Sequence, residues 1–537
     1  MSARVNPVFA FRRPPELDAA ARRRHPVVVV GAGPVGLAAA IDLAQHGIAT
    51  LVLDDDCTVS VGSRAICYAK RTLEILDRLG CGEGVAQKGV QWSVGRVFFR
   101  DAPCYQFDLL PEAGHHRPAF VNLQQYHLEE CLVARAEQSG VDLRWQSRVI
   151  GVTPRADAVD VEVDTPQGRY TLQAQWLVVA DGARSPVRHM LGLETEGQVF
   201  RDRFLIADIR MRSQFPTERW FWFDPPFHPG QSVLLHRQAD DVWRVDFQLG
   251  WDADPDEEKK PERIAPRLRA MLGASAEYEL EWASVYTFQC RRMERFRHGR
   301  VVFAGDAAHL VSPFGARGAN SGIQDADNLA WKLDFVMRGV APASLLDTYD
   351  SERVAAADEN LRNSTRSTDF ITPKSAISRT FRDAVLSLAR RHAFARSLVN
   401  SGRLSVPAVL ADSPLNTHDG DAFAGKMVPG AVACDAPVDG PRGAWLLAHL
   451  GSDFTLLTFG CVVDEATATS LAARRIPIRI VQVGEGGLRD VEGLVASRYD
   501  GRHGSCYLLR PDQHVCARWR AFDRERVIGA VARATGN

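Results

Sequence analysis

Near the start of the chain, two apolar runs that are typical of strands flank a stretch with helical spacing of its apolar residues. Residues 26–30 (PVVVV) are apolar without interruption, which is typical of a strand buried on both faces of a parallel sheet. Residues 37–44 then repeat Leu and Ala at helical spacing, Gly47 ends the pattern, and residues 48–53 (IATLVL) predict a second strand. This order predicts an α/β domain with a Rossmann-like sheet.

Residues 195–299 carry a different pattern. Residues 242–249 (VWRVDFQL) alternate between apolar and polar side chains, and residues 232–238 do so more loosely, which indicates strands with one face toward water. Proline and glycine interrupt the region at residues 225–226 and 229–230. We expect an antiparallel sheet here, inserted between two parts of the α/β domain at residues 26–194 and 300–405.

The last part of the chain predicts a further domain. Residues 413–440 are rich in Pro, Gly, Asp and Ala, so we place a linker at residues 406–440 and the domain at residues 441–537. The pattern predicts the order β-α-β-β-β-α, with strands at 454–459, 476–483, 506–510 and 515–519 and helices at 463–474 and from 522 onward.

Composition excludes several classes of protein. The 65 Lys and Arg residues balance the 66 Asp and Glu residues, so no net charge favours nucleic acid or an anionic membrane surface. The longest apolar run, residues 27–41, contains three glycines and a proline and is shorter than the roughly 20 residues of a membrane span. Residues 1–25 are rich in arginine and lack a long apolar stretch, so we expect a surface arm rather than a signal peptide.

The ten cysteines are scattered, without a C-x-x-C pair or a zinc spacing. They predict no metal site and suit a reducing cytoplasm. The expected partner is a small molecule, and a homodimer is left open.

A glycine motif follows the first strand and opens the helix. Gly31, Gly33 and Gly36 form G-x-G-x-x-G, in which the glycines allow a tight turn, close approach of a pyrophosphate, and close packing of the helix on the strand. Asp54 ends the second strand, where an acid accepts ribose hydroxyls, and Asp55 and Asp56 are alternatives. The motif predicts a dinucleotide site. No second copy lies in a strand–turn–helix setting, so a nicotinamide nucleotide would bind only in passing.

Two later strands end in further motifs. Residues 177–180 lead into Asp181-Gly-Ala-Arg-Ser-Pro, and residues 300–304 lead into Gly-Asp306-Ala-Ala-His. Pro-Phe-Gly-Ala-Arg317-Gly-Ala-Asn-Ser-Gly follows, before a helix predicted at residues 323–338. A glycine-rich turn that delivers a helix N-terminus brings N–H donors and partial positive charge to a group that becomes anionic, as reduced flavin does. Arg317 would strengthen that field.

In this order, the three motifs closely resemble the para-hydroxybenzoate hydroxylase class (class A) of FAD-dependent aromatic monooxygenases, over residues 27–367. Gly-Ser-Arg64-Ala-Ile and Arg71-Thr-Leu-Glu-Ile-Leu resemble the phenol and 3-(3-hydroxyphenyl)propionate hydroxylase branch. The resemblance implies a GR2-type FAD-binding domain, an inserted antiparallel-sheet substrate domain, tightly bound but non-covalent FAD, and NAD(P)H as a transient reductant.

The resemblance also implies roles for individual residues. Asp306 matches the ligand of the ribityl hydroxyls. Gln125 matches a glutamine that touches the linker of the flavin, with Gln124 as a one-residue alternative. The remaining matches are Gly318, Ala319 and Asn320 at the isoalloxazine edge, Arg64 near the pyrophosphate, Asp181 as an acid associated with FAD and NAD(P)H, and Pro313 on the loop where oxygen and substrate meet the ring.

Polar residues of the inserted sheet are candidates for the proton transfer. A phenol must be partly deprotonated to attack an electrophilic peroxide, and we name His236 and Asp246 as candidate bases. Trp220-Phe-Trp222-Phe-Asp224 comes close to the W-x-W-x-I-P signature of flavin-dependent halogenases, but Asp224 replaces the isoleucine. We expect these tryptophans to pack a domain interface.

The C-terminal region resembles the thioredoxin-like appendage of phenol hydroxylase relatives, including the turn Tyr507-Leu-Leu-Arg-Pro-Asp-Gln-His-Val515. Only Cys461 lies near the position of a redox motif, so a structural or dimerising module is expected rather than a disulfide catalyst.

The resulting hypothesis is hydroxylation of a phenolic compound with NAD(P)H and O2 through a flavin C4a-hydroperoxide. Two alternatives remain: another flavin oxygenase on the same scaffold, such as a halogenase or epoxidase, and a non-catalytic FAD-binding protein. Fold alone does not decide among them, because function lies in the site.

Overall fold

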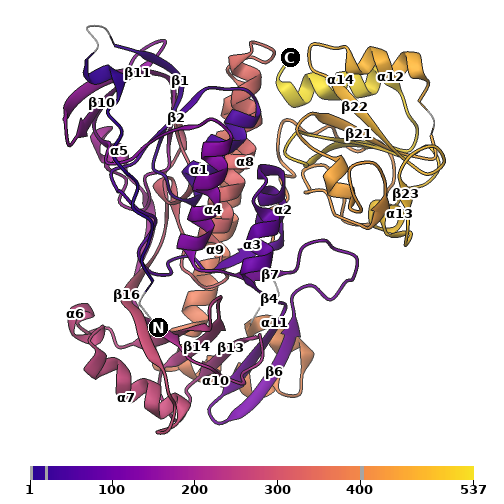
Figure 1. Ribbon diagram of the computed structural model, residues 1–537. Helices are drawn as coiled ribbons and strands as arrows, with labels where there is room; N and C mark the ends of the chain where they lie inside the picture. Colours follow the sequence, from indigo (N-terminus) through magenta and orange to yellow (C-terminus); the bar gives the residue numbers. More distant parts are fainter. Residues whose placement is uncertain (1–3, 19–21, 400–403, 462) are drawn as a thin grey trace.

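The computed structural model describes residues 4–18, 22–399, 404–461 and 463–537. Figure 1 shows an α/β part with the long helices α1, α8 and α9, a sheet below it, and the C-terminal part beside α8. No helix within these residue ranges is long and apolar enough to cross a membrane.

The predicted Rossmann-like sheet is confirmed. Strand β1 (Arg24–Val30) lies between β2 (Thr50–Leu53) and β11 (Gly168–Val179), and all three run parallel. Beyond them the sheet continues with β8 (Asp142–Arg144) on one side and with β18 (Val301–Phe303) and β17 (Arg297–His298) on the other. The first half of β11 instead pairs antiparallel with β10 (Val159–Thr165), which pairs with β9 (Arg148–Pro154).

A group of helices packs beside this sheet. Helix α1 (Pro34–Gln45) contacts α4 (Gln125–Gln138) and α8 (Gly318–Met337), and α8 contacts α9 (Leu345–Ile371) (Figure 1). Helix α8 begins at Gly318, earlier than the predicted start at residue 323. The glycines of this stretch suggested a loop, but the side chain of Asn320 bonds backbone groups of Cys67, Ala69 and Ala316 and fixes the first turn.

The inserted sheet has eight strands in the order β19-β16-β12-β15-β14-β13-β5-β6. The pairing is antiparallel, as predicted, except that β5 and β13 run parallel. Strands β5 and β6 come from the range assigned to the first part of the α/β domain, because β5 pairs with the much later β13. The strands are β5 (Val94–Phe99), β6 (Ala102–Asp108), β12 (Glu196–Arg210), β13 (Arg219–Phe223), β14 (Ser232–Arg237), β15 (Val242–Leu249), β16 (Glu279–Arg292) and β19 (His309–Leu310).

The polar face of β14 and β15 is not wet, in contrast to the prediction. His236, Arg244 and Gln248 are only 2%, 4% and 7% exposed. The prediction is wrong because other parts of the chain cover this face, and His236 and Arg244 line a cavity there.

The C-terminal part is built on the sheet β22-β21-β24-β25. The predicted strands and helices occur in the predicted order, and the structure adds the short helix α13 (Leu494–Tyr499). Residues of the predicted linker pack on this part: Leu410 and Leu415 are buried, and Thr417 N donates to Cys516 O at 2.8 Å. The elements are β21 (Phe454–Phe459), α12 (Glu465–Ala472), β22 (Ile478–Val483), β24 (Cys506–Leu509), β25 (Val515–Trp519) and α14 (Arg524–Thr535).

A buried ion network joins the C-terminal part to α8 and α9. Glu352 of α9 accepts from Arg510 at 2.6 Å and from Lys332 of α8 at 2.7 Å. Arg510 also pairs with Asp512 at 2.5 Å. Arg71 of helix α2 (Lys70–Leu79) donates to the backbone oxygen of Asp512 at 2.8 Å. The turn after β24 is therefore held by charges from both parts of the chain.

The N-terminal arm is anchored on the α/β part. The Phe9 ring stacks on Trp145 with centroids 4.3 Å apart. Buried Glu16 accepts from Arg144 at 2.9 Å and lies 2.9 Å from Nε2 of His25. The arm is thus a packed surface segment over residues 4–18; residues 1–3 and 19–21 lie outside the described residues.

Candidate active site

A cavity of about 770 Å³ lies where the α/β part meets the inserted sheet. Of the predicted site residues, only Gly36 does not line it, because its role is to pack α1 on β1. The cavity is lined by Gly31, Gly33, Asp54, Arg64, Gln125, Asp181, His236, Asp246, Asp306, Pro313, Arg317, Gly318, Ala319 and Asn320.

The glycine turn forms one end of the cavity. Gly31 has φ +103°, and a Cβ there would lie 2.4 Å from Ala180 O. A Cβ on Gly36 would lie 2.0 Å from Gly31 O. A Cβ on Gly33 would meet no heavy atom within 4 Å, so open space lies beside this residue. The turn therefore has no room for a side chain at Gly31 and Gly36, where chain segments pack, but has room for a ligand at Gly33.

Asp54 braces the same turn. Its carboxylate accepts from Ala32 N at 2.5 Å and from Asp56 N at 2.9 Å. Asp55 and Asp56 are exposed. Burial raises the pKa of Asp54 to about 6, so the protonation state of this carboxyl changes close to neutral pH.

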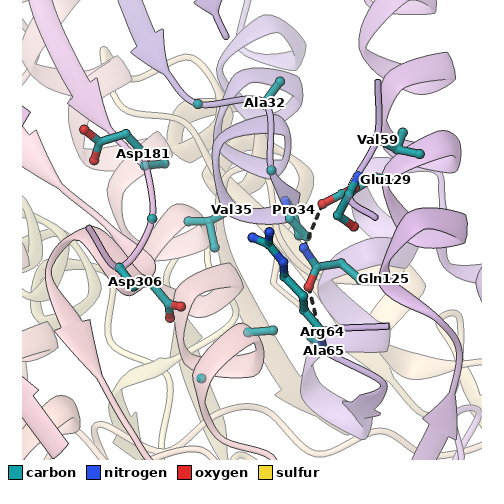
Figure 2. A pocket seen from close by; sticks show the side chains of 18 of the residues that line it. Ala32, Pro34, Val35, Val59, Arg64, Ala65, Gln125, Glu129, Asp181 and Asp306 are labelled. Atoms are coloured by element: carbon teal, nitrogen blue, oxygen red, sulfur yellow. Dashed lines mark hydrogen bonds between the residues drawn. The ribbon is translucent and has the colours of Figure 1, made fainter. Parts of the chain in front are cut away.

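Arg64 and Gln125 lie on the opposite wall from Asp181 and Asp306 (Figure 2). Gln125 accepts from Ala65 N at 2.9 Å and donates to Glu129 at 2.8 Å. The alternative residue, Gln124, is buried and donates to Ala239 O at 3.0 Å. Gln125 is thus the glutamine at the cavity.

Asp181 holds the start of the short helix that follows it. Its Oδ2 accepts from Val187 N at 3.1 Å, whereas Oδ1 has no hydrogen-bond partner among the residues that the structure describes. Burial raises the pKa of Asp181.

Asp306 projects into the cavity from a loop that three further residues support. Asp325 accepts from Gly305 N at 2.9 Å, from Arg353 at 2.6 Å, and lies 2.6 Å from Nε2 of His309. Burial would raise the pKa of Asp325, but His309 and Arg353 outweigh it and hold this pKa below its ordinary value. Desolvation by the surrounding cavity walls raises the pKa of Asp306. Sequence reasoning missed Asp325, although an acid on the buried face of a predicted helix was a usable signal.

The N-terminus of α8 forms the far end of the α/β wall. Gly318 and Ala319 lie in its first turn, and the buried Arg317 precedes it and donates to Asn360 at 3.1 Å. The Asn320 amide is committed to protein backbone, which leaves its own backbone for a ligand. Pro313 is exposed to the cavity on the preceding loop.

The inserted sheet closes the cavity with charged side chains. Arg244 pairs with Asp246 at 2.9 Å and donates to the backbone oxygens of Ser63 and Arg64 at 2.7 and 3.0 Å. His236 Nε2 lies 4.0 Å from Asp246. Burial, together with Arg219 and Arg244, holds the pKa of His236 well below its ordinary value. Sequence reasoning missed Arg219 and Tyr286, which also line the cavity. It also missed that Arg244, a third lining residue, bonds the loop that carries Arg64.

Trp220 and Trp222 do not line the cavity. They pack on the other face of the sheet, where Trp222 stacks with Phe98 at a centroid distance of 5.2 Å. They therefore give no support to halogenation.

The residues present fit FAD. The open space beside Gly33 lies at the N-terminus of α1, a site suited to a pyrophosphate. Asp54 adjoins it, Asp306 faces the cavity further along, and α8 points its N-terminus at the same space. The sheet wall beyond leaves a place for a second molecule.

Comparisons with known proteins agree with this fit. Residues 24–364 match the model of the family described as FAD binding domain. The chain is 31% identical to a Streptomyces rimosus 12-dehydrotetracycline 5-monooxygenase/anhydrotetracycline 6-monooxygenase over 93% of this chain and 95% of the relative. It is 27% identical to a Burkholderia cenocepacia 3-(3-hydroxy-phenyl)propionate/3-hydroxycinnamic acid hydroxylase over 95% and 96% of the two chains. Its fold matches a ternary complex of aklavinone-11 hydroxylase with FAD and aklavinone, with a TM-score of 0.78, 25% identity, and coverage of 96% of this chain and 100% of that one.

Proposed function

We propose a function on the premise that this chain belongs to the FAD binding domain family. The chain is an FAD-dependent monooxygenase, and its substrate in this proposal is a phenolic aromatic compound that it hydroxylates with NAD(P)H and O2. The observation that carries the proposal is the continuous cavity that runs from the glycine turn and Asp306 to the polar wall of the inserted sheet.

When bound, FAD takes electrons from NAD(P)H and activates O2. The residues of the chain supply position, field and exclusion of water. In this proposal Asp54 and Asp306 hold hydroxyl groups of the cofactor, and the N-terminus of α8 with Arg317 places positive charge beside the flavin ring. Pro313, which lines the cavity, would then stand on the loop between the place proposed for that ring and the sheet wall.

The sheet wall orients the substrate in the same proposal. A phenol has to release its proton in part before a ring carbon attacks an electrophilic oxygen. His236 and Asp246 are the wall groups proposed to accept a hydrogen bond from the phenol hydroxyl and so to polarise it. His236 is neutral at neutral pH, because its pKa is held well below the ordinary value, and it therefore retains a nitrogen that can accept a hydrogen bond.

The purified protein is expected to be yellow, and a phenol should accelerate its oxidation of NADH or NADPH. Mass spectrometry with isotopically labelled O2 should find one labelled oxygen atom in the product. The substrates tested are phenols, hydroxybenzoates and hydroxyphenylpropionates. The control measures how much hydrogen peroxide the protein releases when no phenol is added. A protein that holds no flavin after reconstitution, or a product without the label, would rule the proposal out.

The affinity for FAD is expected to fall as the pH falls through about 6, the pKa to which burial raises Asp54. The ionised carboxylate accepts ribose hydroxyls better than the neutral acid, so binding favours the deprotonated form. Below that pKa, each pH unit should weaken binding up to about tenfold. Quenching of FAD fluorescence measures the dissociation constant, and Asp54→Asn should remove this pH dependence. An equal pH dependence in the variant would exclude Asp54 as its source.

A further inference from the structure

Two cysteines, Cys81 and Cys131, face each other between two helices of the α/β part. Cys81 precedes helix α3 (Gly82–Lys88), and Cys131 lies in the middle of α4, which α3 contacts. The sulfur of Cys81 lies 3.8 Å from the backbone oxygen of Cys131, and the sulfur of Cys131 lies 3.9 Å from the backbone oxygen of Cys81. A hydrogen bond also joins the two thiols. Neither residue lines the cavity.

The backbone beside this pair is fixed. Arg135, one turn after Cys131 on α4, donates from Nε to the backbone oxygen of Leu79 at 2.8 Å. Gly80 leaves room for this arginine, because a Cβ there would lie 2.9 Å from its Nε. The loop that carries Cys81 is therefore held against α4, which brings the two residues together as a disulfide requires.

The two thiols differ in acidity. The hydrogen bond from the Cys81 thiol lowers the pKa of Cys131 to about 7. The same bond, together with burial, raises the pKa of Cys81, so that Cys81 keeps its proton and Cys131 becomes the thiolate. Elsewhere burial raises the pKa of Cys67 to about 11 and those of Cys506 and Cys516 to about 12. The thiolate is the form of cysteine that peroxides oxidise, whereas buried neutral thiols are inert.

The reactive member of the pair is also the one that a small oxidant can reach. Cys81 is 2% exposed, whereas Cys131 is half-buried. An accessible thiol of low pKa beside a second thiol is the usual arrangement of a redox-active pair. Hydrogen peroxide is an oxidant that a flavin monooxygenase itself produces, because activated oxygen that meets water instead of substrate is released in this form.

We propose that Cys131 and Cys81 form a reversible disulfide when the protein meets hydrogen peroxide. The thiolate sulfur of Cys131 attacks one peroxide oxygen, so that an S–O bond forms, the O–O bond breaks, and the departing hydroxide takes up a proton to become water. The Cys81 thiol then attacks the sulfenic acid of Cys131. The S–S bond forms, the S–O bond breaks, and hydroxide leaves with the Cys81 proton as water. The two thiols lose two electrons in total, and one peroxide is reduced to two waters.

Peptide mapping of the FAD-loaded protein tests the proposal. The protein is treated with hydrogen peroxide, free thiols are blocked with N-ethylmaleimide, and tryptic peptides are identified by mass spectrometry. The expected product is a pair of peptides linked between Cys81 and Cys131, which dithiothreitol separates. At pH 7, Cys131 should be oxidised about threefold or more faster than Cys57, since its thiolate is more abundant although less nucleophilic than that of an ordinary thiol. Cys57 is half-buried as well and serves as the comparison.

The rate at which Cys131 loses its free thiol should follow its ionisation. This rate should rise as the pH rises through about 7 and level off above that value, because Cys131 is then fully ionised. An ordinary thiol, with a pKa of about 8.5, would continue to gain reactivity at higher pH. A rate for Cys131 that also continues to rise above about pH 8 would overturn the proposal.

Serine variants separate the roles of the two cysteines. Cys81→Ser should stop the reaction at the sulfenic acid of Cys131, which dimedone traps, and Cys131→Ser should leave Cys81 reduced. Cys57→Ser is the matched control and should form the link as the parent does. Oxidation of Cys131 in the parent without a link to Cys81, or equal rates at Cys131 and Cys57, would refute the proposal.

This inference goes beyond the proposed function, and the two fail separately. The proposed function fails on the absence of FAD or of a labelled product. The disulfide fails on the peptide map after peroxide is added, which does not depend on turnover.

Discussion

Replacement of Glu352 by glutamine is expected to lower the free energy of unfolding by about 3–5 kcal/mol, because it leaves the buried Lys332 without a counter-charge and Arg510 with Asp512 alone. Glu352 bonds Arg510 of the C-terminal part and Lys332 of α8, and the three side chains are at most 1% exposed. The amide retains the shape of the carboxylate but not its charge. Urea unfolding followed by tryptophan fluorescence measures the loss, and limited proteolysis reports whether the C-terminal part stays docked.

Asp347→Asn is the matched control for this prediction. Asp347 lies on the same helix and pairs with Arg297 at 2.7 Å, but its side chain is 57% exposed. Solvent screens such a pair, so the expected loss is about 1 kcal/mol or less. Similar losses in both variants would mean that the buried network does not hold the two parts together.

Alanine at two glycines of the same turn is expected to affect two different properties, protein stability at Gly36 and FAD binding at Gly33. Gly36→Ala should destabilise the protein by about 1–3 kcal/mol or more, because the new Cβ would lie 2.0 Å from Gly31 O and force α1 away from β1. Gly33→Ala should change stability by about 0.5 kcal/mol or less, since its φ of −75° suits any residue and no atom lies within 4 Å.

The two variants separate folding from cofactor binding. Gly33→Ala should weaken FAD binding about tenfold to a hundredfold, the cost of lost hydrogen bonds to a charged group, because its methyl group occupies the space proposed for the pyrophosphate. Equilibrium dialysis measures the affinity and thermal unfolding the stability. Unchanged FAD affinity in a folded Gly33→Ala protein would remove the pyrophosphate from this position.

Local patterns in the sequence were sufficient for the α/β part. An apolar strand, a glycine turn and a helix are contiguous, and their physical requirements are local, so β1, α1 and β2 could be predicted from residues 26–53 alone. The same holds for the strand order along the C-terminal part. The start of α8 could not be predicted this way, because Asn320 stabilises it through bonds to Cys67 and Ala69, which are remote in sequence.

The candidate site likewise contains residues that local sequence patterns predict and residues that only contacts between remote parts of the chain bring to it. Residues within motifs, such as Asp54, Asp306 and Pro313, line the cavity as expected. Alternation on β15 identified a polar face but not what covers it, since burial depends on packing of distant elements. Arg219 stands in an aromatic stretch without any motif, and only the strand pairing places it beside His236.

The late position of β18 bears on how the protein is made. Val178 of β11 pairs with Val302 of β18, so most of the inserted sheet leaves the ribosome before the parallel sheet is complete. Until then one side of β11 presents unpaired backbone groups, which invite wrong pairing or chaperone binding. The inserted sheet must therefore form while this edge is open. Since Asp306 and α8 come later still, FAD cannot template the early steps and can only trap a chain that has already closed.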